Sequence, residues 1–344
     1  MKSMKKQIVT SPRNIEFQNV PLPEIKDNEI LIKIKRIGIC GSDIHVYHGL
    51  HPNTEYPVTQ GHEVSGVIEK VGKKIINFKL EDKVTILPQH VCGKCYSCTH
   101  NQYHICDHLQ VMGFQAPGTA SEYFAVDEKF VLKIPEDFTF EQGAMIEPVA
   151  VACGALAKIE KLKGMNVVVL GAGPIGNLTA QVAKALGARS VLITEISNFR
   201  REIARKVGID HIVNPNEANI AQEIVKAFGK DKADLILECV GIFRTINQAI
   251  ENARKGTQIV LVGVYSEKIL IDLNLIQNQE LRLIGTLMYQ KKDYLQAIQL
   301  ISSGKIKLEP LMTDHFSFTD YAKAYEYIDN NQDKTMKVFI DVDK

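Results

Sequence analysis

The sequence has 344 residues, 45% of them hydrophobic and 24% charged, which is the composition of a globular protein; this length predicts about two domains. The net charge of +1 excludes the basic surface that nucleic-acid binding requires. The basic start lacks the apolar segment of a signal peptide, and no run of about 18 apolar residues occurs. We therefore expect a cytoplasmic protein that acts on a small molecule without nucleic acid or membrane. In that compartment clustered cysteines bind metal or catalyse and do not form disulfides.

Three regimes follow one another along the chain. Residues 1–150 alternate short apolar runs with Gly, Pro and Asp, which predicts a small irregular β domain. Residues 163–285 alternate apolar strands with amphipathic helices, which predicts a parallel sheet covered by helices on both faces. The last part carries two helical patterns and a final apolar strand at 336–342, which we expect to close back onto the first domain.

Candidate metal ligands appear first in the β-rich region. "GICGSDIHVYHG" supplies Cys40, Ser42 and His45, and "TQGHEVSG" supplies His62 and Glu63. A later segment, "AMIEPVAVACGA", adds Glu147. Cysteine, histidine and carboxylate from separate segments are the ligands of a catalytic zinc, which keeps one position open for water or substrate. Taken singly, each of these residues also has an ordinary structural explanation, such as packing or a turn.

Four of the seven cysteines lie in "VCGKCYSCTHNQYHIC" at the spacing C-x2-C-x2-C-x7-C: Cys92, Cys95, Cys98 and Cys106. Four thiolates at this density form a closed tetrahedral site, typical of structural zinc. An iron–sulfur centre also accepts four cysteines, so spacing alone leaves both open.

The segment "VVVLGAGPIG" places Gly171, Gly173 and Gly176 at the GxGxxG spacing, between an apolar strand and a helix. This pattern is typical of dinucleotide binding, because the glycines allow a tight turn, a close approach to pyrophosphate and close helix–strand packing. Glu195 ends the next strand, where a carboxylate binds the ribose hydroxyls and repels a 2′-phosphate. NAD is therefore favoured over NADP, although Arg200 and Arg201 offer charges that a 2′-phosphate also accepts. The expected cofactor contacts are Gly171, Gly173, Pro174, Ile175, Gly176, Glu195 and Arg200.

Taken together, "GICGSDIH", "GHEVSGVIEKVG", the four-cysteine lobe, "IEPVAVA" and the glycine motif resemble the zinc-dependent medium-chain alcohol dehydrogenases over nearly the whole chain. Glu147 resembles the sorbitol (polyol) dehydrogenase branch, and "GTLMYQKKDYLQAIQLI" is similar to butanediol dehydrogenases. The polyol enzymes usually carry a His seven residues after this Glu, where this chain has Gly154. A threonine 3-dehydrogenase-like enzyme shares the same motifs, and a zinc- and NAD-binding sensor without turnover is the alternative from another class.

The resemblance implies two zinc ions per chain. The structural zinc is held by the four cysteines of the lobe. Cys40 and His62 ligate the catalytic zinc, while Glu63 and Glu147 supply the carboxylate side, one directly and the other directly or through water. Hydride then passes from a secondary alcohol to NAD, and Ser42 and His45 relay the proton. Cys153 is a rival ligand and Cys239 a packing residue, while Tyr47 and Phe114 are either pocket walls or core aromatics.

The resemblance also implies the domain plan. We expect a GroES-like catalytic domain over residues 1–155, a Rossmann NAD-binding domain over 156–288, and a C-terminal part of the catalytic domain over 289–344. It further implies a homo-oligomer, tetramer or dimer. "GTQIVLVGVYSEKILIDL" contains strand-like material suited to a subunit interface.

Overall fold

The computed structural model describes residues 3–343, whose strands form two large sheets in two separate units. One unit comprises the chain up to Glu147 together with the stretch from Met312 onward, and the other comprises Pro148–Leu311. None of the helices within residues 3–343 is long and apolar enough to cross a membrane.

The main sheet of the first unit has the order β16-β17-β3-β4-β5-β9, with β8 paired to β3. At its centre β3 (Glu29–Gly38) and β4 (Glu63–Val71) run antiparallel. Their inward side chains, among them Ile32 and Ile68, belong to one buried core, as the alternation of apolar and polar residues predicts. The other strands of the first 147 residues are β1 (Ser3–Ser11), β2 (Asn14–Pro21), β5 (Lys83–Ile86), β6 (Gln89–His90), β7 (Gln110–Val111), β8 (Tyr123–Asp127) and β9 (Val131–Lys133).

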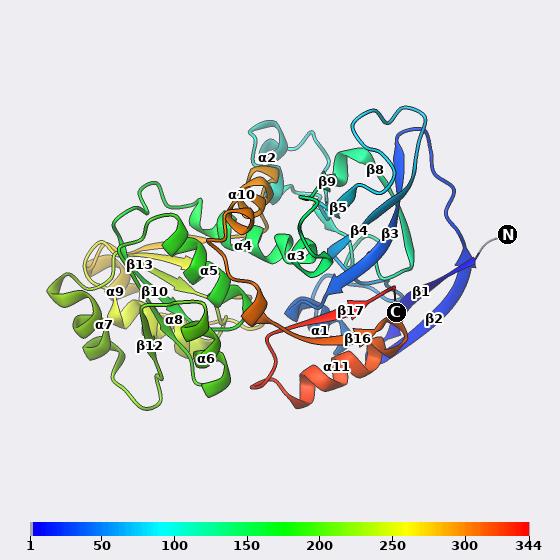
Figure 1. Cartoon of the computed structure of the whole chain (residues 1–344). Helices are drawn as coiled ribbons and strands as arrows, with labels where there is room; N and C mark the ends of the chain where they lie inside the picture. Colours follow the sequence, from blue (N-terminus) through cyan, green and yellow to red (C-terminus); the bar gives the residue numbers. More distant parts are fainter. Residues whose placement is uncertain (1–2, 344) are drawn as a thin grey trace. The chain divides into compact units, whose positions relative to one another are not determined.

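The C-terminal strands complete this sheet. β17 (Lys337–Asp341) pairs antiparallel with β3 on one side and parallel with β16 (Met312–Ser317) on the other. Figure 1 shows the red β17 beside the blue β3, although the two strands stand at opposite ends of the sequence. The final apolar strand thus closes onto the first domain as expected. Its pairing places Phe339 opposite Gly38, the last residue of β3.

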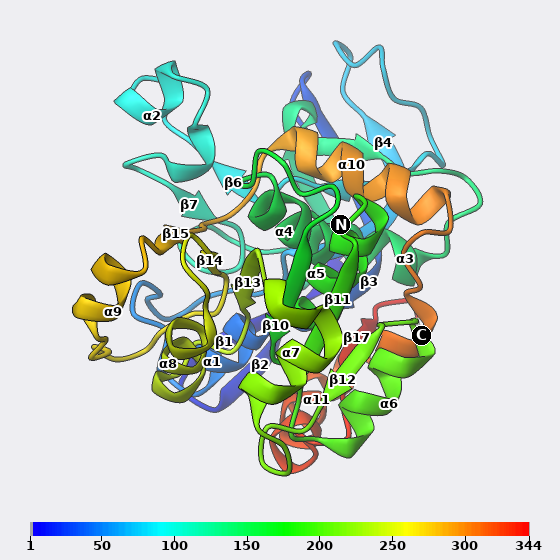
Figure 2. The same cartoon turned by 90° about the vertical axis from the view of Figure 1, so that its left-hand side faces the viewer.

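The second unit is a doubly wound α/β structure, as the alternating pattern predicts. All six of its strands are parallel, in the order β12-β11-β10-β13-β14-β15, which is the Rossmann order. All five residues of β10 (Asn166–Leu170) are buried, since helices cover both faces of such a sheet; Figure 2 shows helices packed along these strands. The other strands are β11 (Ser190–Thr194), β12 (His211–Val213), β13 (Leu235–Glu238), β14 (Gln258–Leu261) and β15 (Arg282–Gly285).

The helices divide between the units in the same way. The first unit contains α1 (Gly41–Tyr47), α2 (Tyr96–Thr99), α3 (Phe140–Ala144) and α11 (Tyr321–Asn330), and α4 (Ile146–Leu156) begins at its end. The second contains α5 (Pro174–Ala185), α6 (Asn198–Lys206), α7 (Ile220–Phe228), α8 (Phe243–Asn252), α9 (Leu273–Asn278) and α10 (Lys291–Ser302).

The division of the chain differs from the boundaries expected after residues 155 and 288. The compact units part after Glu147 and Leu311. Residues 289–311 stay with the second unit because they pack on it. Gln181 of α5 hydrogen-bonds the backbone N–H of Lys307 at 2.7 Å, and Gly154 of α4 lies against Tyr289 and Asp293.

Candidate functional site

The first functional residues are arranged around the start of α1. Cys40 is the N-cap of this helix, and the Asp43 carboxylate accepts a hydrogen bond from the Cys40 backbone N–H at 2.9 Å. This reciprocal cap follows from the local sequence "CGSD", because the third helical residue can reach back to the cap. Asp43 is fully buried. It therefore fixes the backbone from which the Cys40 thiol projects.

Asp43 also faces His62, which precedes β4. Its Oδ1 lies 3.6 Å from the His62 Nδ1, and neither atom has a hydrogen-bond partner among residues 3–343. Burial lowers the pKa of His62, but the Asp43 carboxylate and the Cys40 sulfur outweigh it and raise that pKa well above its usual range. The surroundings thus favour positive charge at this imidazole. With Nδ1 directed at the carboxylate, Nε2 is the nitrogen free for a metal.

Glu63 completes the group. Cys40, His62 and Glu63 each place one possible ligand atom within 4.8 Å of the others. The start of α1 and the start of β4 thus bring together three residues that the sequence singled out. Sulfur, imidazole nitrogen and carboxylate oxygen are the ligand types of a catalytic zinc. The donor set, its burial and its preference for a cation therefore fit this metal.

Lys337 is the residue of this site that sequence reasoning missed. Its Nζ donates to both Glu63 carboxylate oxygens, at 2.6 and 2.8 Å, and to the carbonyl of Ile39 at 3.0 Å. Only 3% of the Lys337 side chain and 1% of the Glu63 side chain are exposed. The available signal was a lysine at the start of the mainly apolar strand "KVFID", since a buried lysine needs a buried acid.

Burial acts to lower the pKa of Lys337, but Glu63, Cys40 and Glu147 together raise it. These acidic groups therefore favour the charged form of the lysine beside the candidate metal ligands. Gly38 makes room for this pair, because a Cβ at that position would stand 2.3 Å from a Glu63 oxygen.

The remaining predicted residues occupy different positions. Glu147, on α4, is buried and lies near enough to act on Lys337, but it stands outside the group formed by Cys40, His62 and Glu63. Ser42 is half-buried on α1, two residues beyond Cys40, and His45 is exposed one turn further along the helix.

Phe114 and Tyr47, the two aromatic residues considered as pocket walls, occupy different environments. The Phe114 ring centroid lies 5.0 Å from that of His62, so Phe114 borders the metal-ligand group. Tyr47 instead belongs to the main core of the first unit, and its ring lies 4.9 Å from that of Tyr325. Tyr47 is therefore a core aromatic.

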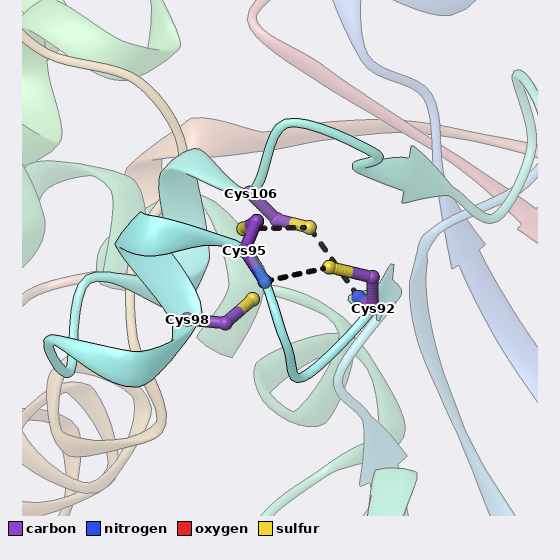
Figure 3. Close-up of side chains that lie close together, drawn as sticks. All are labelled: Cys92, Cys95, Cys98 and Cys106. Atoms are coloured by element: carbon purple, nitrogen blue, oxygen red, sulfur yellow. Dashed lines mark hydrogen bonds between the residues drawn. The ribbon is translucent and has the colours of Figure 1, made fainter.

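The four cysteines converge in a loop around α2 (Figure 3), where their sulfur atoms lie within 4.8 Å of one another. The Cys95 and Cys106 sulfurs are 3.8 Å apart. Zn–S bonds of about 2.3 Å in a tetrahedron give a similar S···S separation of about 3.8 Å. The site therefore fits a zinc ion with no open position.

Backbone N–H groups of this loop donate hydrogen bonds to the sulfur atoms of Cys92 and Cys106. The N–H of Cys95 donates to the Cys92 sulfur, and the N–H groups of Cys92 and His108 donate to the Cys106 sulfur, each at 3.3 Å. Donors of this kind lower the pKa of Cys92 to about 6 and also lower that of Cys95. Burial and the neighbouring thiols raise the pKa of Cys98 to about 12.

The rival ligand Cys153 and the packing residue Cys239 lie outside this loop. Burial raises the pKa of Cys153 to about 12 and also raises that of Cys239. Neither belongs to a metal-ligand group among residues 3–343.

In the second unit the glycine motif connects β10 to α5. Gly173 is the N-cap of α5 and Pro174 its first residue, with Ile175 next in the same turn. Gly171 has a φ of +91°, and a Cβ at Gly176 would stand 1.9 Å from the Gly171 carbonyl oxygen. Only glycine fits at Gly176, so the helix N-terminus packs closely on the strand and presents its N–H groups at the sheet edge.

Glu195 lies directly after β11 beside this loop. One carboxylate oxygen accepts the N–H of Ala172 and the other that of Ser197, both at 2.9 Å. A carboxylate has about four acceptor positions, so both oxygens retain capacity for ribose hydroxyls. The Arg200 Nη1 would lie 3.8 Å from a Cβ at Gly173, whereas Arg201 donates to the carbonyls of Glu195 and Ile196 at 3.0 and 2.6 Å.

A third group of potential ligands has another explanation. Glu141, His315 and Asp341 also come within 4.8 Å of one another, but the Arg36 Nε lies 2.6 Å from Glu141 and 3.1 Å from Asp341. We interpret this group as part of the Arg36 ion-pair network, because one guanidinium contacts both carboxylates. Unlike the group of Cys40, His62 and Glu63, it offers no thiol.

Proteins of known family resemble this chain in both units. The family of the alcohol dehydrogenase GroES-like domain matches residues 26–136, and that of the zinc-binding dehydrogenases matches residues 174–303. The D-xylulose reductase of Saccharomyces cerevisiae is 36% identical over 97% of this chain and 96% of its own length. The chain belongs to the zinc-dependent medium-chain alcohol dehydrogenases. It is an alcohol or polyol dehydrogenase whose cofactors are zinc and NAD(P).

Other relatives mark the range of this dehydrogenase family. The L-threonine 3-dehydrogenase of Pyrococcus horikoshii is 32% identical over 90% of this chain and 91% of its own length. An Escherichia coli alcohol dehydrogenase solved with NADH has a TM-score of 0.91 at 30% identity and covers 99% of each chain. A Sinorhizobium meliloti zinc-binding dehydrogenase solved with NADP has the same TM-score at 27% identity, over 99% of this chain and 100% of its own.

Proposed function

We propose that this dehydrogenase oxidises a secondary hydroxyl of a polyol or sugar alcohol to a ketone, with NAD as hydride acceptor. The observation that carries the choice of substrate is the 36% sequence identity with a D-xylulose reductase over 97% of this chain. Glu147, at the position that resembles the polyol branch, supports the same choice.

We propose that Cys40, His62 and Glu63 hold the catalytic zinc directly, because they converge on one point. Glu147, which stands outside that group, is proposed to act through an intervening water. A zinc ion held by these residues with one open position would lower the pKa of a bound alcohol toward neutral pH. Ser42 then accepts the proton of that alcohol and passes it toward the exposed His45, while Asp43 keeps the His62 ring in orientation.

We propose that the loop from Gly171 to Gly176 and the adjoining Arg200 bind the cofactor, and that Glu195 selects NAD. The carboxylate is held at the end of β11 by two backbone N–H groups, and a 2′-phosphate there would meet its negative charge. Relatives solved with NADH and with NADP both occur, so the choice rests on this residue.

The test is reduction of NAD by purified enzyme with a panel of xylitol, sorbitol, butane-2,3-diol and L-threonine. We expect the highest kcat/KM with a polyol and NAD. Threonine as the best substrate would replace the polyol assignment with the amino-acid alternative, which the threonine dehydrogenases among the relatives favour. The absence of turnover with the entire panel would overturn the substrate class.

We also propose a homo-oligomer, dimer or tetramer, assembled through the far edge of the parallel sheet. β15 is an edge strand, and apolar side chains nearby are exposed, including Leu270 at 81%, Leu273 at 69% and Val264 at 69%. Exposed sheet edges and clustered exposed apolar side chains are normally covered. Light scattering of wild type and of the Leu270→Lys, Leu273→Lys double variant tests this, with a smaller assembly expected for the variant.

We place the enzyme in the cytoplasm, because all seven cysteines are free and six of them lie in metal-ligand groups or are buried. Clustered reduced thiols of this kind belong to a reducing compartment. Fractionation of cells that express a tagged chain checks the location.

A further inference from the structure

His51, in the loop between α1 and β4, lies beside the metal-ligand group without belonging to it. Its ring stacks on Phe114 with centroids 4.8 Å apart and planes 20° apart, and the same Phe114 ring lies 5.0 Å from His62. Both histidines therefore contact the same Phe114 ring, His51 in a stacked and His62 in a tilted arrangement. His51 also feels the charges of Asp43, His45 and His62.

The imidazole of His51 is held in one orientation. Its Nδ1 lies 2.7 Å from the Thr54 hydroxyl oxygen. Within residues 3–343 its other nitrogen, Nε2, makes no hydrogen bond, and the ring is half-buried. Burial, followed by the charges of His45 and His62, lowers the pKa of His51. A neutral imidazole at neutral pH serves hydroxyl groups better than anionic ones, since it offers no countercharge.

Open space adjoins this stack. Phe114 and Thr54, the two residues that fix the His51 ring, both line a cavity of about 780 Å³. Asn53, Thr59 and Gln115 add neutral polar groups to its wall, and Lys6 and Glu55 add one charge of each sign. His51 and the metal-ligand residues lie beside this cavity and not in its wall, and Phe114 is the residue that borders both the cavity and His62. The cavity offers space for a hydroxylated chain next to the Phe114 ring.

We propose that His51 is a specificity-determining residue, which hydrogen-bonds a hydroxyl of the substrate remote from the carbon that is oxidised. This rests on the proposed polyol oxidation. The imidazole, oriented by Thr54 and stacked on Phe114, hydrogen-bonds a hydroxyl along the polyol chain. The carbinol that is oxidised lies at Cys40, His62 and Glu63. The preferred substrate class is therefore a polyol with several hydroxyls, and a monohydric secondary alcohol of equal length lacks the group that His51 recognises.

The test compares xylitol with pentan-2-ol, which has the same chain length without the remote hydroxyls. In His51→Leu, kcat/KM for xylitol should fall roughly tenfold, as expected for one lost neutral hydrogen bond, while kcat/KM for pentan-2-ol stays within about twofold. Thr54→Val should shift the same ratio in the same direction by a smaller factor, because the ring loses its orientation. His48→Gln is the matched control, since His48 lies three residues earlier, bonds Asp329 at 2.8 Å and should leave the ratio unchanged.

A binding measurement separates recognition from turnover. The dissociation constant of xylitol from the enzyme–NADH complex, in which no hydride transfer occurs, is read from NADH fluorescence and should rise by the same factor in His51→Leu. Equal losses for xylitol and pentan-2-ol, or unchanged xylitol binding, would overturn the role of His51 and leave polyol oxidation intact. Failure of the wild type to oxidise xylitol or sorbitol, with turnover of another alcohol, would overturn the proposed substrate and this inference with it.

Discussion

At the residue scale, the pair of Lys337 and Glu63 provides the sharpest prediction. In zinc-depleted protein, Lys337→Met leaves the Glu63 carboxylate buried without a cation, and such a loss typically costs about 3–5 kcal/mol of unfolding free energy. The double variant Lys337→Met, Glu63→Met should recover much of that stability, because replacing both charges with apolar groups is far less costly. Denaturant unfolding of the three proteins measures both effects.

The exposed Lys255 supplies the matched control, and Lys255→Met should change the unfolding free energy by less than about 0.5 kcal/mol. If Lys337→Met were equally mild, the pair would have little energetic importance. Zinc content of the double variant adds a second readout. It should fall by about one ion per chain if Glu63 is a direct ligand, and stay at two if Glu147 takes that place.

Glu195 gives a prediction about the cofactor. Glu195→Ser removes the carboxylate that is proposed to bind the ribose hydroxyls, and a lost hydrogen bond to a charged group is worth about 1.5–3 kcal/mol. We expect kcat/KM with NAD to fall by roughly tenfold or more. The preference for NAD, measured as kcat/KM with NAD divided by kcat/KM with NADP, should fall by at least the same factor. Glu202→Ser, on the exposed face of α6 where it pairs with Arg205, is the control. An unchanged ratio in Glu195→Ser would assign the discrimination to another residue.

The residue scale also shows which roles the sequence can reveal. Cys40, His62 and Glu63 were recognisable because their types and motifs suit zinc, and the structure brings them within 4.8 Å. Lys337 was not, because its partner lies 274 positions away and no local pattern links them. Asp43 was visible beside Cys40, but its contact with His62 depends on how α1 meets β4.

At the element scale, the loop around α2 should depend on its metal. Cys95→Ala removes one of four ligands, and we expect loss of about one zinc ion per chain with faster proteolysis of residues 91–109. Structural zinc supplies folding free energy to such loops. Metal analysis and limited proteolysis measure the two effects. Cys153→Ala, which removes a buried thiol outside both metal-ligand groups, should retain two ions; loss of zinc there would revive Cys153 as a ligand.

Helix α4 explains the departure from the polyol pattern at Gly154. A Cβ at this position would stand 3.2 Å from the Tyr289 Cβ and 3.4 Å from an Asp293 carboxylate oxygen. The histidine of the related enzymes would therefore need these neighbours to move. The sequence showed the substitution, but only the packing of residues 289–293 on α4 gives its physical reason.

At the scale of the whole molecule, the sequence predicted the type of fold more accurately than the residues at which the chain divides into units. The parallel sheet was evident because each of its strands is a short apolar run followed by a helical pattern. The boundaries were less accessible, since α10 is an ordinary amphipathic helix whose partner is decided by contacts such as that between Gln181 and Lys307. The C-terminal strand was placed correctly because an apolar strand must pair with a sheet.

Arg36 ties the two ends of the first unit together, and this network sets the response to acid. Its guanidinium contacts Glu141 of α3 and, beyond β17, Asp343. Despite burial, which acts to raise them, the contacts with Arg36 lower the pKa values of Glu141 and Asp343 below their ordinary 4.5 and 3.8. The folded chain therefore binds fewer protons at these groups than the unfolded chain does, so their contribution is fully present above those ordinary values and is lost as pH falls through and below them.

Arg36→Met should therefore lower stability at pH 7, by about 1–3 kcal/mol for the lost charged hydrogen bonds, and should flatten the decline between pH 7 and pH 3. The reason is that Glu141 and Asp343 then titrate more nearly as they do in the unfolded chain. Unfolding free energies measured across this range check the slope, with Arg205→Met as control because Arg205 pairs only with the exposed Glu202 on its own helix. A variant that lost stability equally at every pH would show that Arg36 contributes packing and not charge. An acid response unchanged from wild type would mean that other carboxylates control it, and the C-terminal strand would then be held mainly by its pairing with β3.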